Sequence, residues 1–101
     1  MPYNPPVNGA AFRFFISLPD QAAPGSVKSS PTIAAGDFKV SKNGGALANL
    51  TTLPSVAPAA SVMVQIDLSG TEMTADNVTV VCIDQTTPKE WADTVINIVT
   101  T

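Results

Sequence analysis

The fold class of this 101-residue chain is decided by the stretch Asp37-Phe38-Lys39-Val40-Ser41-Lys42-Asn43-Gly44-Gly45. Apolar and polar side chains alternate along its first half, which is the period of a β-strand with one buried face. Asn43-Gly44 follows, and both residues accept the positive φ angles that a tight type I′ turn requires. A second extended run begins at Ala46. The stretch therefore predicts a β-hairpin over residues 37–50.

The same period of two continues on both sides of the hairpin, and no segment keeps a helical period beyond two turns. Prolines exclude residues 51–60 from a central strand, because proline cannot donate to a sheet ladder. The clearest amphipathic strand is 61–69, where Val64 and Ile66 share one face and Gln65 lies on the other. The other strands that we expect are residues 12–18, 77–84 and 94–100.

These strands predict an all-β fold, a small single-domain antiparallel β-sandwich or barrel that is Ig-like or jelly-roll-like. Ser69 and Glu72 have the spacing of a capping box, which predicts one short helical turn near residues 69–76. Residues 77–84 and 94–100 are apolar on both faces, so we expect each of these strands to be central or covered on both sides.

The chain length fits one domain, which we place at residues 12–101. Residues 1–11 contain Pro2, Pro5 and Pro6 and are expected to form an extended N-terminal arm. A proline-rich end favours a polyproline-like conformation, which either frays in solvent or lies along a neighbouring subunit.

The composition argues against an enzyme. The chain has no histidine and one cysteine, so Ser-His-Asp and Cys-His machinery and most zinc sites are excluded. Cys82 lies in an apolar run and is expected to be a small buried hydrophobe. We therefore predict no catalytic residue, no cofactor and no metal. Glu72 and Asp76, which could share a cation, are assigned instead to capping and solvated charge because the calcium-loop pattern is missing. Asp84, Glu90 and Asp93 flank the last turn and could form a glycosidase pair, but such a pair needs a sugar-sized cleft with aromatic platforms, and Trp91 is the only tryptophan.

The charge pattern favours protein partners. Five cations are scattered along the chain, which excludes a nucleic-acid footprint, and no apolar run reaches the length of a membrane span. Only 13% of residues are charged, and charged residues are depleted at the cores of interfaces. Trp91 is either a lid on the core or an exposed anchor for a partner. The candidate interface residues are Tyr3, Pro5, Pro6, Trp91, Val95 and Val99.

A family resemblance begins at residue 36. The hairpin stretch above is followed by Leu68-Ser69-Gly70-Thr71-Glu72-Met73-Thr74-Ala75-Asp76 and then by a hydrophobic strand. This order resembles a group of small virion-associated β domains of tailed bacteriophages and prophages. In that group a "DF-x-VS-K-D/N-GG" hairpin precedes an "L-S-x-x-E-M-x-A-D" segment.

The resemblance implies a non-enzymatic structural protein made in the host cytoplasm and located on the virion, with the capsid exterior favoured. Such a capsid decoration or cement protein would bind the major capsid protein and stabilise the assembled head. It implies a homo-oligomer, with a trimer favoured and a dimer possible. The alternatives are a tail, neck or fibre-adaptor component and, from a different class, a carbohydrate-binding module that uses Trp91 and Tyr3.

Overall fold

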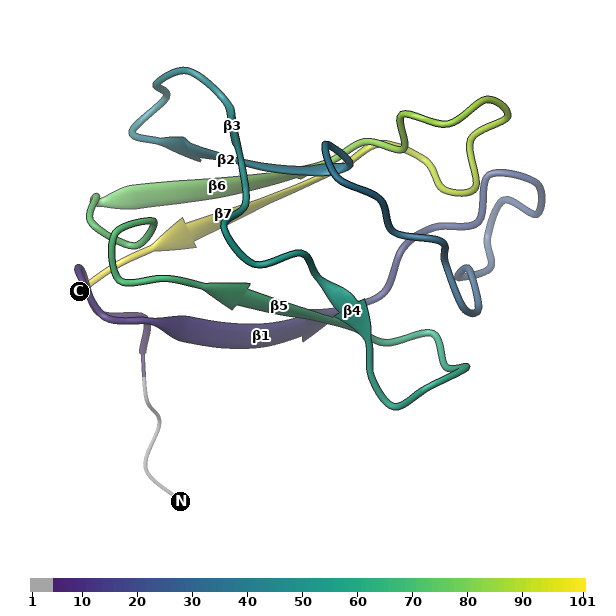
Figure 1. Cartoon of the computed structure of the whole chain (residues 1–101), viewed down its shortest axis with the longest axis horizontal. Coiled ribbons are helices and arrows are strands. Elements are labelled where there is room, and N and C mark those ends of the chain that lie inside the picture. Colours follow the sequence, from purple (N-terminus) through teal and green to yellow (C-terminus); the bar gives the residue numbers. More distant parts are fainter. Residues whose placement is uncertain (1–4) are drawn as a thin grey trace.

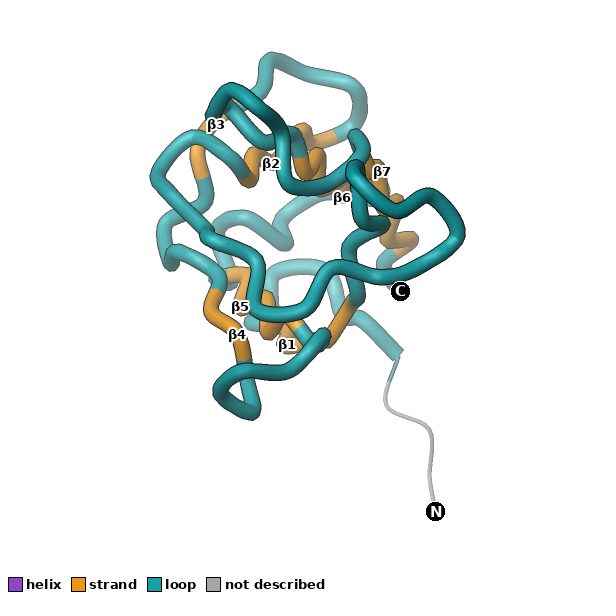
Figure 2. Tube along the Cα trace, turned by 90° about the vertical axis from the view of Figure 1, so that its right-hand side faces the viewer, coloured by secondary structure: helices purple, strands orange, loops and turns teal. Residues whose placement is uncertain are grey.

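In the described part of the chain, seven β-strands form two antiparallel sheets, which Figures 1 and 2 show as the two layers of a sandwich. The computed structural model describes residues 5–101. One layer has the strand order β1-β5-β4 and the other has the order β3-β2-β6-β7. The predicted all-β sandwich is therefore confirmed. The strand bounds are β1 Phe12–Ile16, β2 Phe38–Lys42, β3 Ala48–Asn49, β4 Ser55–Val56, β5 Val64–Leu68, β6 Asn77–Cys82 and β7 Thr94–Val99.

The core follows directly from the alternation in the sequence. In β5, Val64, Ile66 and Leu68 are buried, while Gln65 and Asp67 point outward. In β6 the buried face belongs to every second residue from Val78 to Cys82. Each sheet thus turns one apolar face inward, and burial of these faces holds the two layers together.

The predicted turn at Asn43-Gly44 is present. Asn43 and Gly44 have φ values of 52° and 78°, and the N–H of Gly45 donates to the Lys42 carbonyl at 2.9 Å. The returning strand is shorter than expected. Val40 pairs with Ala48. Val40 lies two residues before Lys42, where the turn begins, whereas Ala48 lies three residues after Gly45, where the turn ends. One extra residue on the returning side interrupts the ladder, and β3 is left with only two residues.

The capping box predicted at Ser69 and Glu72 is also present. The Glu72 N–H donates to Ser69 Oγ at 3.2 Å, and the Ser69 N–H donates to Glu72 Oε1 at 2.8 Å. The N–H of Met73 closes a single turn on the Ser69 carbonyl, and its side chain is fully buried. The other oxygen of Glu72 accepts the N–H of Thr51 at 2.9 Å, so this carboxylate also anchors the connection after β3.

Residues 51–60 were expected to be a connection, and the structure adds a short strand to it. Ser55 and Val56 form β4, which pairs with Gln65 and Val64 of β5 at the margin of the smaller sheet. The strand lies between Pro54 and Pro58, which agrees with the confinement of proline-bounded segments to sheet edges.

The described part of the predicted arm is attached to the sandwich. Asn8 donates its N–H to the Thr101 carbonyl, Thr101 donates to the Pro6 carbonyl at 2.9 Å, and Gly9 donates to Met73. A Cβ on Gly70 would lie 2.7 Å from the Gly9 carbonyl oxygen, so this close approach requires glycine at position 70. Residues 1–4, including the predicted interface residue Tyr3, are outside the described residues.

Candidate interaction surface

The buried carboxylates hold the backbone in place. The two oxygens of Asp37, which is 1% exposed, accept the N–H groups of Ala34 and Gln85 at 2.9 Å each. Asp84 is also buried, and its oxygens accept the N–H groups of Thr86 and Glu90. Within residues 5–101 no cluster of three or more histidine, cysteine, aspartate or glutamate side chains could hold a metal ion. Asp37 and Asp84 are therefore loop anchors, a role that was not predicted from the sequence for either residue.

The ionised form of Asp84 is favoured in the folded protein. Burial opposes ionisation, but the backbone N–H groups of Glu90 and Thr86, the Thr86 hydroxyl and the charge of Lys89 together outweigh it, so the pKa of Asp84 lies below its usual value. The pKa of Asp67 is lowered as well, first by the hydrogen bond from Arg13 and then by that from Gln65. Both groups therefore bind a proton more weakly in the folded chain than in the unfolded chain.

This difference predicts a loss of stability in acid. A carboxyl group whose pKa is lower in the folded state than in the unfolded state stabilises the folded protein. This stabilisation is fully present above the unfolded-state pKa of about 4, and it is lost as the pH falls through the folded-state pKa. Asp84→Asn is expected to lower the free energy of unfolding at neutral pH, and this deficit should shrink as the pH falls toward about 2. Urea unfolding at a series of pH values measures this deficit in the free energy of unfolding. The control is Asp76→Asn, at an exposed carboxylate. A deficit independent of pH would contradict the assignment.

Trp91 is a core residue. Its side chain is fully buried, its ring centroid lies 6.0 Å from that of Phe38, and its indole N–H donates to the Cys82 carbonyl at 3.2 Å. The backbone around it is fixed by a bridge to Asp20. Of the two interpretations drawn from the sequence, the lid on the core is correct. Trp91 is therefore withdrawn as an interface residue, because a side chain without exposed surface cannot contact a partner.

Cys82 lies in the same region, and burial raises the pKa of its thiol to about 12. This agrees with the expected role of an inert hydrophobe, because the thiolate is the reactive form.

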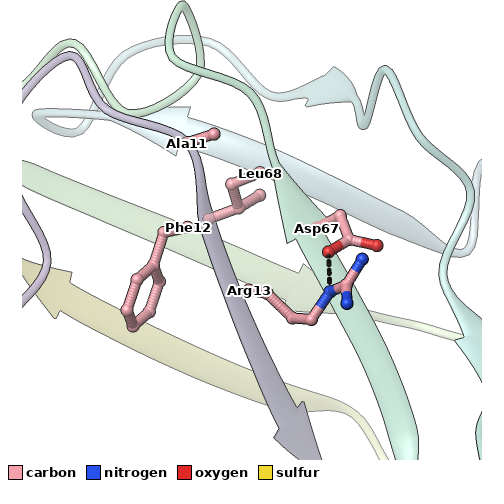
Figure 3. A pocket seen from close by; sticks show the side chains of 5 residues that line it. All are labelled: Ala11, Phe12, Arg13, Asp67 and Leu68. Atoms are coloured by element: carbon pink, nitrogen blue, oxygen red, sulfur yellow. Dashed lines mark hydrogen bonds and ion pairs between the residues drawn. The ribbon is translucent and has the colours of Figure 1, made fainter. Parts of the chain in front are cut away.

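A shallow depression lies where β1 and β5 pair (Figure 3). Arg13 and Asp67, which are opposite each other in the register, form an ion pair of 2.6 Å between Nε and Oδ1. Ala11, Phe12 and Leu68 complete the lining. The Arg13 side chain is 62% exposed, and exposed ion pairs contribute little to stability or binding. The depression offers a surface contact and no enclosed site.

The outward face of β7 is the most apolar exposed feature on the larger sheet. Val95 and Val99 are 64% and 65% exposed, the two largest values among the large hydrophobic side chains that are exposed in residues 5–101. Asn97 lies between them, accepting from the Thr79 hydroxyl and donating to Asn77. We call Val95, Asn97 and Val99 the β7 surface. It carries no charge, and residues with exposed apolar area of this kind are common at interfaces.

The exposure of β7 corrects one expectation. Strand β6 is central, as its two apolar faces suggested, but β7 is an edge strand with an uncovered outer face. Within residues 5–101, no other element covers the outer side chains of Val95 and Val99.

The structure brings some of the predicted interface residues together and separates others. Val95 and Val99 share the β7 surface, and the half-buried Pro6 is bonded to Thr101 just beyond its end. Pro5 precedes it and is also half-buried. Asn97 was missed because its side chain is polar, although its position between the two valines in a strand of period two could have identified it.

Comparison with known proteins returns no relative: no family model, no curated protein and no solved structure matches the chain. The described residues also contain no helix with the length and hydropathy of a membrane span. The features that bear on function are therefore the β7 surface and the resemblance of the two sequence motifs.

Proposed function

We propose that this protein is a non-enzymatic structural component of a bacteriophage virion, and that it decorates the outside of the capsid through protein–protein contacts. The observation that carries the proposal is the uncharged, apolar β7 surface on a sandwich whose buried polar side chains, within residues 5–101, all have hydrogen-bond partners. Such a surface favours burial against another protein. The motif resemblance supplies the virion context, with the major capsid protein as the partner.

A decoration protein acts by mass action. Because it binds the assembled shell and not the separated capsomers, its binding free energy is added to the stability of the shell. A rigid module suits this role. Here three hydrogen bonds join the long loop after β1 to the loop before β7: the N–H of Gln21 donates to the Glu90 carbonyl, the N–H of Ala92 to the Pro19 carbonyl, and the N–H of Thr32 to the Glu90 carboxylate.

The experiment is quantitative mass spectrometry of purified virus particles. A decoration protein is expected at a copy number comparable to that of the major capsid protein, because it occupies repeated positions of the lattice. A few copies per particle would instead support the second candidate, a tail, neck or fibre-adaptor component. Complete absence from particles would contradict both.

The carbohydrate-binding alternative loses its main support. It relied on Trp91 as a stacking platform, and that side chain is fully buried.

A further inference from the structure

In the part of the chain that the structure describes, the outer edge of β7 presents backbone groups that no other element uses. Thr100 donates its N–H to the Asp76 carbonyl at 3.0 Å. In the antiparallel register of β6 and β7, the N–H and C=O groups of the even-numbered residues of β7 therefore point toward β6. Because these directions alternate along a strand, those of Val95, Asn97 and Val99 point away from β6. Within residues 5–101 no hydrogen bond from another element reaches them. This edge can therefore accept one more strand.

The sequence of the edge is symmetric. Val95-Ile96-Asn97-Ile98-Val99 has the same order of residues in both directions. Two antiparallel copies related by a two-fold axis at Asn97 would place valine opposite valine, isoleucine opposite isoleucine and asparagine opposite asparagine. Cross-strand pairs of β-branched residues stabilise a sheet. The edge is thus complementary to a second copy of itself, as a two-fold interface requires.

The edge also lacks the usual protection against pairing. Exposed edges of natural sheets are commonly guarded by lysine, proline or a bulge. From Thr94 to Thr101 the chain has no proline and no charged side chain, so two copies would meet without repulsion between like charges.

The N-terminal segment fixes the register of such a pair. Thr101 is already bonded to Pro6 and Asn8 on this side of β7. A register centred on Ile98 would place Val95 opposite Thr101, whose backbone groups are occupied. A register centred on Asn97 uses Val95, Asn97 and Val99 together and leaves the bonds of Thr101 intact.

We propose that two copies of this chain form a dimer through antiparallel pairing of their β7 edges, with the two-fold axis at Asn97. The two larger sheets then become one continuous sheet, and Val95 of each copy lies beside Val99 of the other on the same face. Figure 2 shows β7 at the margin of its layer, close to the C-terminus. The inference does not depend on the virion proposal, and its two-fold symmetry corresponds to the dimer that was expected as possible and not to the trimer that was favoured.

A pair of cysteine variants tests this register. Asn97→Cys places two thiols opposite each other in a hydrogen-bonded pair, where the Cα atoms are about 5.5 Å apart, within the range of a disulfide. Val95→Cys is the matched control on the same face of the same strand. Its equivalent in the second copy would be displaced by four residues, about 13 Å along the strand, which is too far to crosslink.

The double variant Val95→Cys with Val99→Cys gives an independent crosslink, because these positions oppose each other across the axis. Cys82 is buried and does not interfere. After mild oxidation, Asn97→Cys and the double variant are expected to form covalent dimers several-fold more completely than Val95→Cys. Equal crosslinking of Asn97→Cys and Val95→Cys would overturn the register, and thermal unfolding verifies that each variant is folded.

Sedimentation of the unmodified full chain, in the absence of any particle, measures the association itself. The expected mass is twice the 10.4 kDa of one chain. A monomer at every concentration, or a trimer, would overturn the proposal. Because no capsid is present, these outcomes are independent of the copy number in particles that tests the virion role.

Discussion

Replacing Trp91 with alanine is expected to destabilise the protein more than any other single truncation in the core. The side chain is fully buried against Phe38, and its indole N–H is bonded to the Cys82 carbonyl. Truncation removes this contact area and leaves a cavity, for which the usual cost is about 3–5 kcal/mol. The whole stability of a domain of this size is about 5–15 kcal/mol, so the variant should be close to unfolding at physiological temperature.

Circular dichroism during heating measures the effect, with an expected fall in the melting temperature on the order of 20 °C. Fluorescence cannot be used for the variant, because Trp91 is the only tryptophan. Leu47→Ala, at a side chain that is 50% exposed, is the control and should change the free energy of unfolding by less than about 0.5 kcal/mol. If the two variants were equally stable, Trp91 would not be part of the core.

Replacing Asp37 with alanine is expected to have the second largest effect. Its carboxylate accepts the N–H groups of Ala34 and Gln85, and its own carbonyl accepts the N–H of Ile83. The side chain therefore joins the loop before β2 to the segment after β6. Its removal leaves two N–H groups without an acceptor, and each loss of a bond to a charged acceptor costs about 1.5–3 kcal/mol.

Asp37→Asn provides a graded comparison. The amide keeps one acceptor oxygen and presents an NH₂ group to the second N–H, so its stability should lie between those of the native protein and Asp37→Ala. Urea unfolding measures all three proteins, and Asp76→Ala, at an exposed carboxylate, is expected to stay within about 0.5 kcal/mol of the native value. If Asp37→Ala matched Asp76→Ala, Asp37 would not act as an anchor.

Local features of this protein could be predicted from the sequence because they depend on neighbouring residues. The turn at Asn43-Gly44 follows from the tolerance of these residues for positive φ, and the capping box follows from the spacing of Ser69 and Glu72. The buried face of β5 follows from a period of two. None of these features requires knowledge of which strands are neighbours.

The position of β7 could not be predicted in the same way. An apolar pattern on both faces indicates that a strand is covered on both sides, but it does not indicate whether the cover belongs to the same chain. Only the pairing of β6 with β2 on one side and β7 on the other leaves β7 at the edge. The free edge, and with it the candidate interface, is a property of the assembled sheet.

Trp91 shows the same limit for a single residue. A tryptophan after a turn is equally compatible with a core lid and with an exposed anchor, and the choice depends on contacts with Phe38 and Cys82, which are distant in the sequence or across a loop. The sequence by itself determined the longer strands, the turn at Asn43-Gly44 and the inward face of β5, because these arise from backbone preferences and side-chain period. The tertiary structure alone decided which side chains lost all solvent contact and which strand edge remained free, because both depend on how distant segments pair and pack.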